Sequence, residues 1–438
     1  MDPVKKMASQ QAVVIPDDFE ITPEIEHAFD LMEHSRRHVY LTGKAGTGKS
    51  TLLQYFKEKT ARNVIVLAPT GVAAINVGGS TIHSFFRFPP RLITPNELRR
   101  VRGREKLLAA LDTIVIDEVS MVRADVLDAV DHALRLNRHR PDEAFGGVQV
   151  ICIGDLYQLP PIVEPELQDY LADTYESPYF FDARVFKENK FEVIELGKVF
   201  RQSDSGFIGL LNKIRNNELE ESDLVDLNRR CDPSLGFEKE GPAITLTSTN
   251  RRASAINRSR LEALDSEGYA FDAAVNGDFD EASYPTDERL ELKAGAQVMM
   301  VRNDPSKRWV NGSLGVVQKL SRDSITVALG DSACAVEPSE WEKIGYEYNK
   351  AEGRIEPKVT GSFKQYPIKL AWAITIHKSQ GKTFDNVIID LGRGAFAHGQ
   401  TYVALSRCRS IEGIRLMKPI QPSDIILDGT VSRFHNGP

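Results

Sequence analysis

One eight-residue run has the residue types and spacing of a loop that binds phosphate groups. The run begins at Gly43 and ends with Lys49 and Ser50, and it fits G-x-x-x-x-G-K-[ST]. Its glycines let backbone N–H groups turn toward an anion, and a helix beginning near Ser50 adds the partial positive charge of its N-terminus. Lys49 would supply a point charge to the β- and γ-phosphates of a nucleotide, and the Ser50 hydroxyl would ligate Mg²⁺. The expected nucleotide contacts are Gly43, Ala45, Gly46, Thr47, Gly48, Lys49, Ser50 and Thr51.

Two adjacent acidic residues supply the matching chemistry. Asp117 and Glu118 end the apolar run TIVIDE (113–118). At the carboxyl end of a strand, Asp117 is expected to hold Mg²⁺ directly or through water, and Glu118 is placed to polarise an attacking water. This pair indicates hydrolysis rather than phosphoryl transfer to a substrate. The alternative is a pair that only caps the next helix, and the phosphate loop upstream makes it the weaker reading.

Three further residues could sense or stabilise the terminal phosphate. Gln158, in GDLYQLPPI (154–162), could touch both the water and the γ-phosphate, although the prolines beside it could also mark only a rigid turn. Arg201 in KVFRQ and Arg407 in VALSRCR belong to a later part of the chain. An arginine that reaches the γ-phosphate from a separate domain stabilises charge in the transition state and makes domain closure depend on the nucleotide. The expected catalytic residues are Lys49, Glu118, Gln158, Arg201 and Arg407.

The elements that must position these residues read as a doubly wound α/β domain. Short, β-branched, nearly uncharged runs alternate with helical periods, which is typical of parallel strands that are buried on both faces. Ligands of such sheets sit beyond the carboxyl ends of the strands. The expected strands lie within RHVYLTG (37–43), VIVLAP (64–69), TIVIDE (113–118) and VQVICIGD (148–155).

A second α/β pattern follows, with an interruption of different texture. It begins near FEVIELGKVFRQ (191–202) and continues as a strand that turns into a helix at 243–264. Short alternating strands at about 295–366 predict a small inserted β barrel, and prolines and arginines at 85–104 mark a shorter insertion in the first domain. The expected domains are therefore 1–200, 201–294 together with 367–438, and 295–366.

Composition narrows the class of protein. The chain has 438 residues, of which 41% are hydrophobic and 27% charged, and these shares exclude disordered and fibrous classes. A net charge of −7 argues against coating nucleic acid by bulk positive charge but leaves a local basic groove open. No run is long enough to span a membrane and no leader is evident, so we expect a cytoplasmic protein. The four cysteines form no C-x-x-C pair, which indicates neither a zinc ribbon nor a disulfide framework.

Taken in order, these motifs resemble a known family. The set is GKAGTGKST, APTGVAAINVGGSTIHSFF, IVIDEVSMV, FGGVQVICIGDLYQLPP, FRQ, TIHKSQGKTFD and YVALSRCRS. It resembles superfamily-one DNA helicases of the 5′-to-3′ subgroup, to which RecD and the PIF-type helicases belong. The stretch at 122–149 resembles the segment that separates PIF-type enzymes from RecD. The resemblance runs from about Leu41 to Arg409 and looks like a bacterial-type core.

The resemblance implies both an architecture and a DNA track. It implies two tandem RecA-like domains, an SH3-like barrel where the β insertion lies, and a wedge near the duplex junction at 85–104. It also implies a nucleotide contact at Gly381. The implied single-strand contacts are Pro69, Thr70, Thr81, His83, Ser84, Asn250, Thr375, His377 and Lys378.

One position departs from the family pattern. The family often has a glutamine in an L-S-x-E-Q segment, where it recognises adenine. Here the segment reads Ile21-Thr22-Pro23-Glu24-Ile25, with Ile25 in place of the glutamine. Use of nucleoside triphosphates other than ATP is therefore open.

The residues themselves predict hydrolysis of ATP with Mg²⁺, and the resemblance implies a helicase that moves 5′ to 3′ on single-stranded DNA. The resemblance implies forked or tailed duplexes and G-quadruplexes as substrates, and roles in replication, recombination or repair. We expect a monomer in solution. One alternative is a DNA-stimulated ATPase or translocase that does not separate strands, and another is a nucleotide-gated module that only grips DNA. A DEAD-type RNA helicase fits less well because Asp117 and Glu118 precede Val-Ser rather than Ala-Asp.

Overall fold

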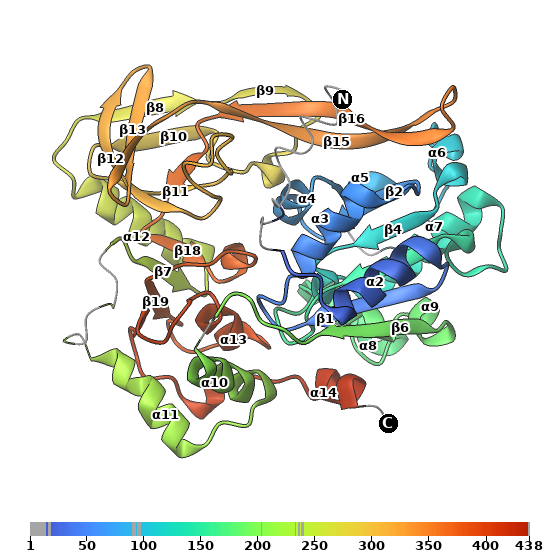
Figure 1. The fold of residues 1–438 in the computed structure, drawn as a ribbon, viewed down its shortest axis with the longest axis horizontal. Coiled ribbons are helices and arrows are strands. Elements are labelled where there is room, and N and C mark those ends of the chain that lie inside the picture. Colours follow the sequence, from blue (N-terminus) through green and yellow to red (C-terminus); the bar gives the residue numbers. More distant parts are fainter. Residues whose placement is uncertain are drawn as a thin grey trace.

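The computed structural model describes residues 15, 19–89, 93, 98–202, 204–232, 234, 237 and 241–436. A six-stranded parallel sheet with the order β3-β2-β4-β5-β1-β6 organises the first domain (Figure 1). The expected strands at 37–43, 64–69, 113–118 and 148–155 are confirmed as members of this sheet. Its strands are β1 (His38–Gly43), β2 (Val64–Ala68), β3 (Ser80–Thr81), β4 (Thr113–Ile116), β5 (Gln149–Ile153) and β6 (Phe191–Leu196).

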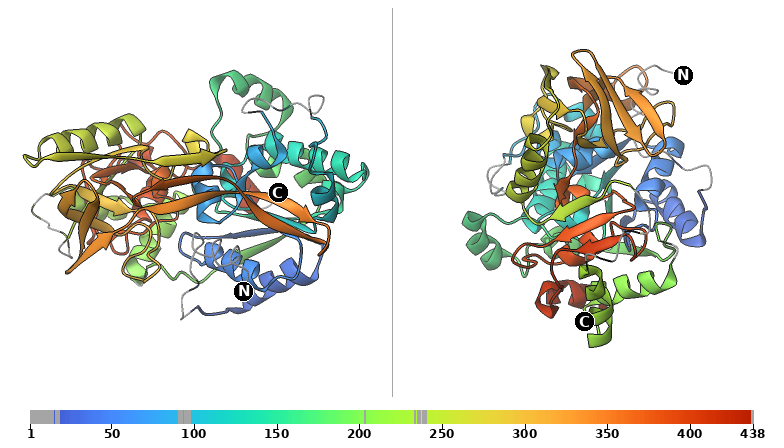
Figure 2. Two further views of the ribbon diagram at one scale, coloured as in Figure 1. Left: turned by 90° about the horizontal axis from the view of Figure 1, so that it is seen from above. Right: turned by 90° about the vertical axis from the view of Figure 1, so that its left-hand side faces the viewer.

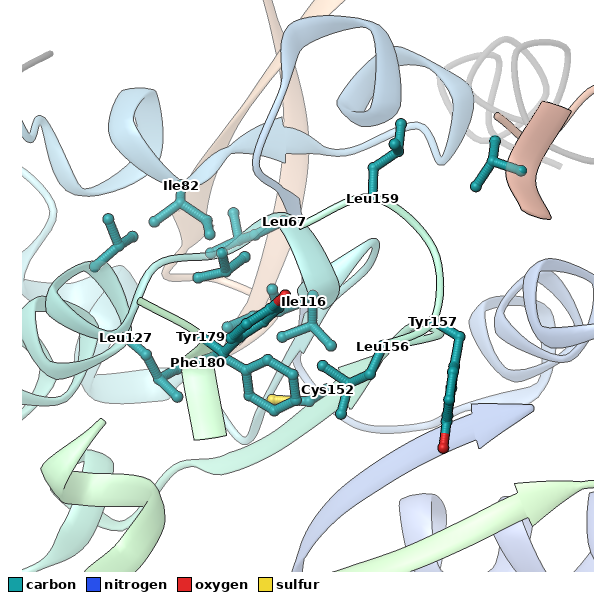
Figure 3. Close-up of a cluster of buried hydrophobic side chains, with 14 of the residues drawn as sticks. Leu67, Ile82, Ile116, Leu127, Cys152, Leu156, Tyr157, Leu159, Tyr179 and Phe180 are labelled. Carbon is teal, nitrogen blue, oxygen red and sulfur yellow. The ribbon is translucent and has the colours of Figure 1, made fainter. Parts of the chain in front are cut away.

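Each face of the first sheet is covered, as the uncharged strand sequences require. Val39 and Leu41 of β1 pack into one hydrophobic cluster with the helices before and after the strand, whereas Tyr40 belongs to the cluster on the other face. Figure 3 shows part of that second cluster, in which Leu67, Ile116 and Cys152 of three neighbouring strands meet Leu127. The helices are α2 (Pro23–His34), α3 (Lys49–Lys59), α4 (Gly71–Asn76), α5 (Ile82–Phe86), α6 (Glu105–Ala110), α7 (Ala124–Arg138), α8 (Pro165–Thr174) and α9 (Arg184–Glu188).

A second parallel sheet, with the order β18-β7-β19-β20, forms the other half of the α/β core. The predicted strand that turns into a helix at 243–264 is confirmed as β7 followed by α12. The strands are β7 (Ile244–Thr247), β18 (Ala373–Thr375), β19 (Val387–Asp390) and β20 (Ile414–Leu416). The helices are α10 (Ser205–Asn216), α11 (Glu221–Asn228), α12 (Asn250–Glu262), α13 (Gln400–Leu405) and α14 (Gly429–Asn436).

Antiparallel strands occupy most of the chain between α12 and β18. They form a five-stranded sheet of order β14-β13-β12-β11-β17, a three-stranded sheet of order β15-β16-β9, and the pair β10-β8. The expected insertion at 295–366 lies inside this region, which begins earlier, at β8. The strands are β8 (Gly268–Asp272), β9 (Ala274–Gly277), β10 (Arg289–Lys293), β11 (Gln297–Met300), β12 (Leu314–Ser321), β13 (Ser324–Leu329), β14 (Ser332–Val336), β15 (Ser339–Asn349), β16 (Arg354–Gln365) and β17 (Ile368–Leu370).

The long hairpin β15–β16 extends from the antiparallel region to the first domain (Figures 1 and 2). At its tip, Ile355 donates its backbone N–H to the Asn63 side chain at 3.0 Å. The Tyr346 hydroxyl lies 3.5 Å from the carbonyl oxygen of Val66 in β2. The hairpin therefore connects the antiparallel region to the first domain, in addition to the close approach of Ser283 to Gly71 in α4.

Part of the shorter insertion expected at 85–104 lies outside the described residues, namely 90–92 and 94–97. At its start, the rings of Phe85 and Phe86 are buried in the first domain. At its end, the Arg104 guanidinium donates to the carbonyl oxygen of Phe85 at 2.5 Å. In the described part of the chain, no helix is both long and apolar enough to cross a membrane.

Candidate nucleotide and DNA sites

A cleft of about 860 Å³ lies at the carboxyl edge of the first sheet and is closed by residues of the second half of the chain. It gathers most of the residues that the sequence nominates for nucleotide chemistry. Gly43 is the exception, since it does not line the cleft, although its carbonyl oxygen accepts from the Lys49 ammonium. The nominated lining residues are Ala45, Gly46, Thr47, Gly48, Lys49, Ser50, Thr51, Asp117, Glu118, Gln158, Arg201, Gly381 and Arg407.

The phosphate loop takes its shape from two glycines with positive φ. Gly48 caps α3 with φ 86°, in the left-handed region, so the first turn of the helix opens into the cleft. Gly46 has φ 83°, and a Cβ there would lie 2.5 Å from the Cβ of Arg201. A side chain at Gly46 would therefore displace the segment that carries Arg201, which explains why glycine is needed at this position.

Lys49 lies inside the loop it belongs to. Its ammonium donates to the carbonyl oxygens of Gly43 at 2.6 Å and Lys44 at 3.0 Å. Burial lowers the pKa of Lys49, and the charges of Asp155 and Glu118 oppose that shift. The loop thus holds a cation where phosphate oxygens could replace the two carbonyls.

The two carboxylates at the end of β4 lie in a region with little access to water. Burial, and next the charge of Glu118, raise the pKa of Asp117 to about 7. Burial is also the main cause that raises the pKa of Glu118, and Lys49 opposes it. The backbone of Glu118 is left-handed, with φ 51° and ψ 44°, a conformation that non-glycine residues adopt rarely. Strain at such a position is common at functional sites.

The two arginines approach the cleft from different segments. Arg201 follows β6, and its guanidinium donates to the carbonyl oxygen of Ser406 at 3.3 Å. Arg407 follows α13 and donates through Nε to the carbonyl oxygen of Val403 at 2.9 Å. Burial, and next the charge of Arg201, lower the pKa of Arg407 to about 9. The guanidinium groups of Arg201 and Arg407 therefore lie close together in a buried space. An anion bound between them would reduce their mutual repulsion.

The residues expected to contact DNA form two groups, and neither group lines the cleft. The first follows β2 and β3, the outermost pair of strands of the first sheet. Thr70 caps α4 by accepting from Ala73 N–H at 3.2 Å, and Thr81 caps α5 by accepting from Ser84 N–H at 3.1 Å. His83 lies in α5, where burial is the main cause that lowers its pKa. Pro69 and Ser84 are half-buried beside them.

The second group occupies the corresponding place in the second sheet. Asn250 is exposed at the first turn of α12, directly after β7. Thr375 ends β18 and accepts from the backbone N–H of Lys378 at 3.3 Å. His377 lies in the single helical turn after it, where burial lowers its pKa, and the Lys378 side chain is exposed. Both groups thus follow the carboxyl ends of an edge pair of parallel strands.

Ile25, which stands where the family often has glutamine, lies in the hydrophobic core. Its side chain is 1% exposed, on the buried side of α2 among Leu52 and Phe56 of α3. The cleft is instead lined near this helix by Phe19 and Glu20, with Phe200 of the segment after β6. The Phe200 ring is 45% exposed and would lie 3.7 Å from a Cβ at Gly48.

Several lining residues were missed by the sequence reasoning. Lys382 directly follows Gly381 in the motif TIHKSQGKTFD, so proximity to a nominated residue could have found it. Asn311 lies between β11 and β12, and its side chain accepts from the Lys382 ammonium at 2.7 Å. No motif marks Asn311, because its segment belongs to the inserted strands and only the tertiary structure brings it to the cleft.

Comparisons with known proteins found relatives that are similar in sequence to this chain. The profile of the PIF1-like helicases matches residues 20–223, and that of the 2B domain of DNA helicase Pif1 matches residues 281–320. The chain is 33% identical to the ATP-dependent DNA helicase Pif1 of Bdellovibrio bacteriovorus over 429 residues, covering 95% of this chain and 92% of that protein. It spans about 60% of the length of the vertebrate relatives it matches.

Two crystal structures of a Bacteroides relative differ in how well they superpose on this chain. The complex of that Pif1 with ADP-AlF4 has a TM-score of 0.88 at 39% identity, over 96% of this chain and 97% of that one. The same protein bound to single-stranded DNA has a TM-score of 0.70 at 39% identity, with the same coverage. The unliganded structure of the same protein has a TM-score of 0.87 at 40% identity, so the arrangement described above is closer to the unliganded and ADP-AlF4 structures than to the complex with single-stranded DNA.

Proposed function

The chain belongs to the PIF1-like helicase family, and we propose that it is an ATP-dependent DNA helicase that moves 5′ to 3′ on single-stranded DNA. One observation carries the proposal: a single cleft gathers Lys49, Glu118 and Gln158 of the first sheet with Arg407 of the second. A nucleotide in this cleft would be surrounded by both halves of the α/β core. Binding and hydrolysis would then close and reopen the two halves.

The residues of the cleft fit a Mg²⁺–nucleotide complex. Lys49 would exchange its two loop carbonyls for phosphate oxygens, while the first turn of α3 would donate backbone N–H groups. Asp117 and the Ser50 hydroxyl line the same cleft and would hold Mg²⁺, which usually takes one or two carboxylates and completes its shell with phosphates and water. Mg²⁺ bound there would neutralise part of the negative charge on the phosphate oxygens.

Hydrolysis would depend on a base and on cations that meet the developing charge. Glu118 is half-buried at the cleft, where the charge of Lys49 acts on it, and it would accept a proton from the attacking water. Gln158 would orient that water or the γ-phosphate. Arg201 and Arg407 would stabilise the transition-state charge, a role that in related enzymes is worth about 10³–10⁵ in rate. Because these two arginines already share a buried space, the γ-phosphate would also relieve their mutual repulsion.

The two groups of residues expected to contact DNA, which follow β2 and β3 in the first sheet and β7 and β18 in the second, would bind one DNA strand without reading its sequence. Threonine and serine hydroxyls, imidazoles and helix N-termini contact phosphates and carry no base information. The first group would hold the strand on the first domain and the second group on the other. Alternating grip by the two groups during opening and closing would produce a step along the strand.

The substrates would be forked and tailed duplexes, with G-quadruplexes as a further class. The resemblance of the whole chain to PIF-type enzymes supports these substrates, and a monomer in solution stays a prediction. Light scattering of the free protein checks the oligomeric state, and a quadruplex with a 5′ single-stranded tail checks the second substrate class.

The deciding experiment compares matched duplexes that carry either a 5′ or a 3′ single-stranded tail. ATP-dependent release of strand from the 5′-tailed duplex alone, lost in Glu118→Gln, is the expected result. Release from the 3′-tailed duplex alone would overturn the polarity. ATP turnover without release from either duplex would leave a translocase that does not separate strands. Negligible turnover with DNA present would leave a module that only grips DNA.

A further inference from the structure

The loop that carries Gln158 is organised around one buried carboxylate. Asp155 accepts from Gln158 Nε2 at 3.2 Å and from the backbone N–H of Tyr157 at 3.2 Å. Its own carbonyl oxygen accepts from Gln158 N–H at 2.9 Å. Figure 3 shows Leu156 of this loop within the hydrophobic cluster and Tyr157 standing at its edge. The orientation of the Gln158 amide therefore depends on where Asp155 is held.

An arginine from the second half of the chain reaches that carboxylate. Arg215, near the end of α10, places Nη2 3.4 Å from Asp155 Oδ1, and the two side chains are 5% and 0% exposed. Its guanidinium carbon lies 3.7 Å from the centre of the Tyr157 ring. Among the described residues, Arg215 Nε has no hydrogen-bond acceptor. This buried ion pair and the ring contact join α10 to the loop, so the position of Asp155 depends on α10.

The same loop is held a second time, at the start of α13. His398 Nε2 donates to the carbonyl oxygen of Leu156 at 2.7 Å, while Nδ1 accepts from Asp428 N–H at 2.9 Å. Gly399 has φ 68°, and a Cβ there would lie 2.3 Å from the carbonyl oxygen of Tyr157. The start of α13 thus packs directly against the backbone of the loop that carries Gln158. The same helix leads to Arg407.

We propose that Arg215 and His398 are positioning residues that tie Gln158 to the second half of the α/β core. Through Asp155 and the Leu156 carbonyl, the Gln158 amide moves with α10 and α13. It therefore meets the γ-phosphate only when the two halves are closed. This coupling rests on the proposed ATP-driven function and extends it: the sensor of the nucleotide belongs to the first sheet by sequence but is oriented by the second domain.

The test is a double-mutant cycle between Arg215 and Gln158. Arg215→Met removes the guanidinium, and we expect DNA-stimulated kcat to fall about tenfold or more while KM for ATP stays within about threefold. That split follows because the interaction matters in the transition state rather than in the ground state. Arg215→Lys keeps a charge for Asp155 and should recover part of kcat. Adding Arg215→Met to Gln158→Ala should cause no further loss, because the arginine acts only through the glutamine.

A matched control lies on the same helix. Lys213 in α10 pairs with Asp223 at 2.8 Å, away from the loop. Lys213→Met should leave kcat and KM for ATP unchanged. If Arg215→Met lowers the melting temperature by more than a few degrees, the cycle is run with Arg215→Lys, which keeps the buried charge paired.

The outcomes separate this inference from the proposed function. Additive losses in the double variant, or a rise in KM with kcat unchanged, would overturn the positioning role even if the protein is an active helicase. A wild-type protein without DNA-stimulated ATP turnover would remove the proposed function and this inference with it. Active wild-type protein with a non-additive cycle and partial rescue by lysine would establish the role.

Discussion

The Tyr402 hydroxyl in α13 accepts a 3.1 Å hydrogen bond from the backbone N–H of Ala45 in the phosphate loop, across 357 residues of sequence. Burial, and next the charge of Asp155, raise the pKa of Tyr402 to about 12, so the phenol stays protonated at neutral pH. The helix that leads to Arg407 is therefore attached to the loop that would bind the phosphates. A nucleotide that binds at Ala45 would therefore act directly on the position of the second domain.

Removing this hydroxyl should weaken nucleotide binding. Tyr402→Phe leaves the buried N–H of Ala45 without its acceptor, at a cost of about 1–3 kcal/mol. We expect affinity for a non-hydrolysable ATP analogue to fall by up to about tenfold, measured by calorimetry, with a modest drop in melting temperature. Tyr366→Phe, in the antiparallel region, is the control. Unchanged affinity in Tyr402→Phe would show that the contact does not support the loop.

Nucleotide affinity should depend on pH through Lys382. Burial, and next the charge of Lys369, lower the pKa of Lys382 to about 7, so much of it is neutral at physiological pH. Phosphates in the cleft would raise that pKa, and binding would then take up a proton. Affinity should be constant below about pH 7 and fall as the pH rises above it, toward the raised pKa of the bound state.

Calorimetry at pH 8, in buffers with different ionisation enthalpies, measures this proton uptake. Lys382→Gln should reduce it, and only the protons exchanged by Asp117 in the same cleft should remain. Burial also lowers the pKa of Lys369, to about 8, but that residue does not line the cleft. Lys369→Gln removes a charge that lowers the pKa of Lys382, so it should reduce the proton uptake at pH 8 without abolishing it. Equal uptake in the wild type and Lys382→Gln would place the triphosphate away from this ammonium.

The enzyme should hydrolyse several nucleoside triphosphates. Ile25 is buried in the core, and the exposed Phe200 ring offers a stacking surface that any base can use. We expect kcat/KM for GTP, CTP and UTP within about tenfold of that for ATP. Phe200→Ala should raise KM for all four by a similar factor of about tenfold, since stacking on an aromatic ring is worth about 1–3 kcal/mol per base. Phe396→Ala, an exposed phenyl outside the cleft, is the control, and a strong preference for ATP in the wild type would contradict this prediction.

The two histidines of the edge groups should support DNA binding as neutral imidazoles. Burial lowers the pKa of both His83 and His377, so neither gains a charge between pH 7 and 8. The double variant His83→Ala/His377→Ala should bind single-stranded DNA about tenfold or more weakly, since each lost hydrogen bond costs about 1 kcal/mol. Fluorescence anisotropy measures the affinity, while turnover without DNA should stay unchanged. His34→Ala, on the exposed end of α2, is the control, and a drop in DNA-independent turnover would indicate a structural defect instead.

The parts of this protein that local chemistry controls could be predicted from the residues. Glycines at the turns of the phosphate loop, uncharged strands before polar ends and a helical period after Ser50 each depend on neighbouring residues, so the first sheet and its loop could be predicted. The nominated residues Lys49, Asp117 and Glu118 lie together because the carboxyl ends of parallel strands meet at one edge of a sheet. The order of the motifs was enough to indicate the family.

Packing between elements, rather than any local pattern, brings distant segments of the chain together. The Tyr402–Ala45 and Arg215–Asp155 contacts join residues whose separation in sequence carries no periodic signal. Asn311 reaches the cleft from the inserted strands, and Ile25 turns into the core because α2 buries that side against α3. Such contacts form when the whole chain closes on itself, and their geometry depends on packing between elements rather than on the preferences of any one segment. The coupling between nucleotide and domain closure is therefore a property of the fold that its motifs alone do not reveal.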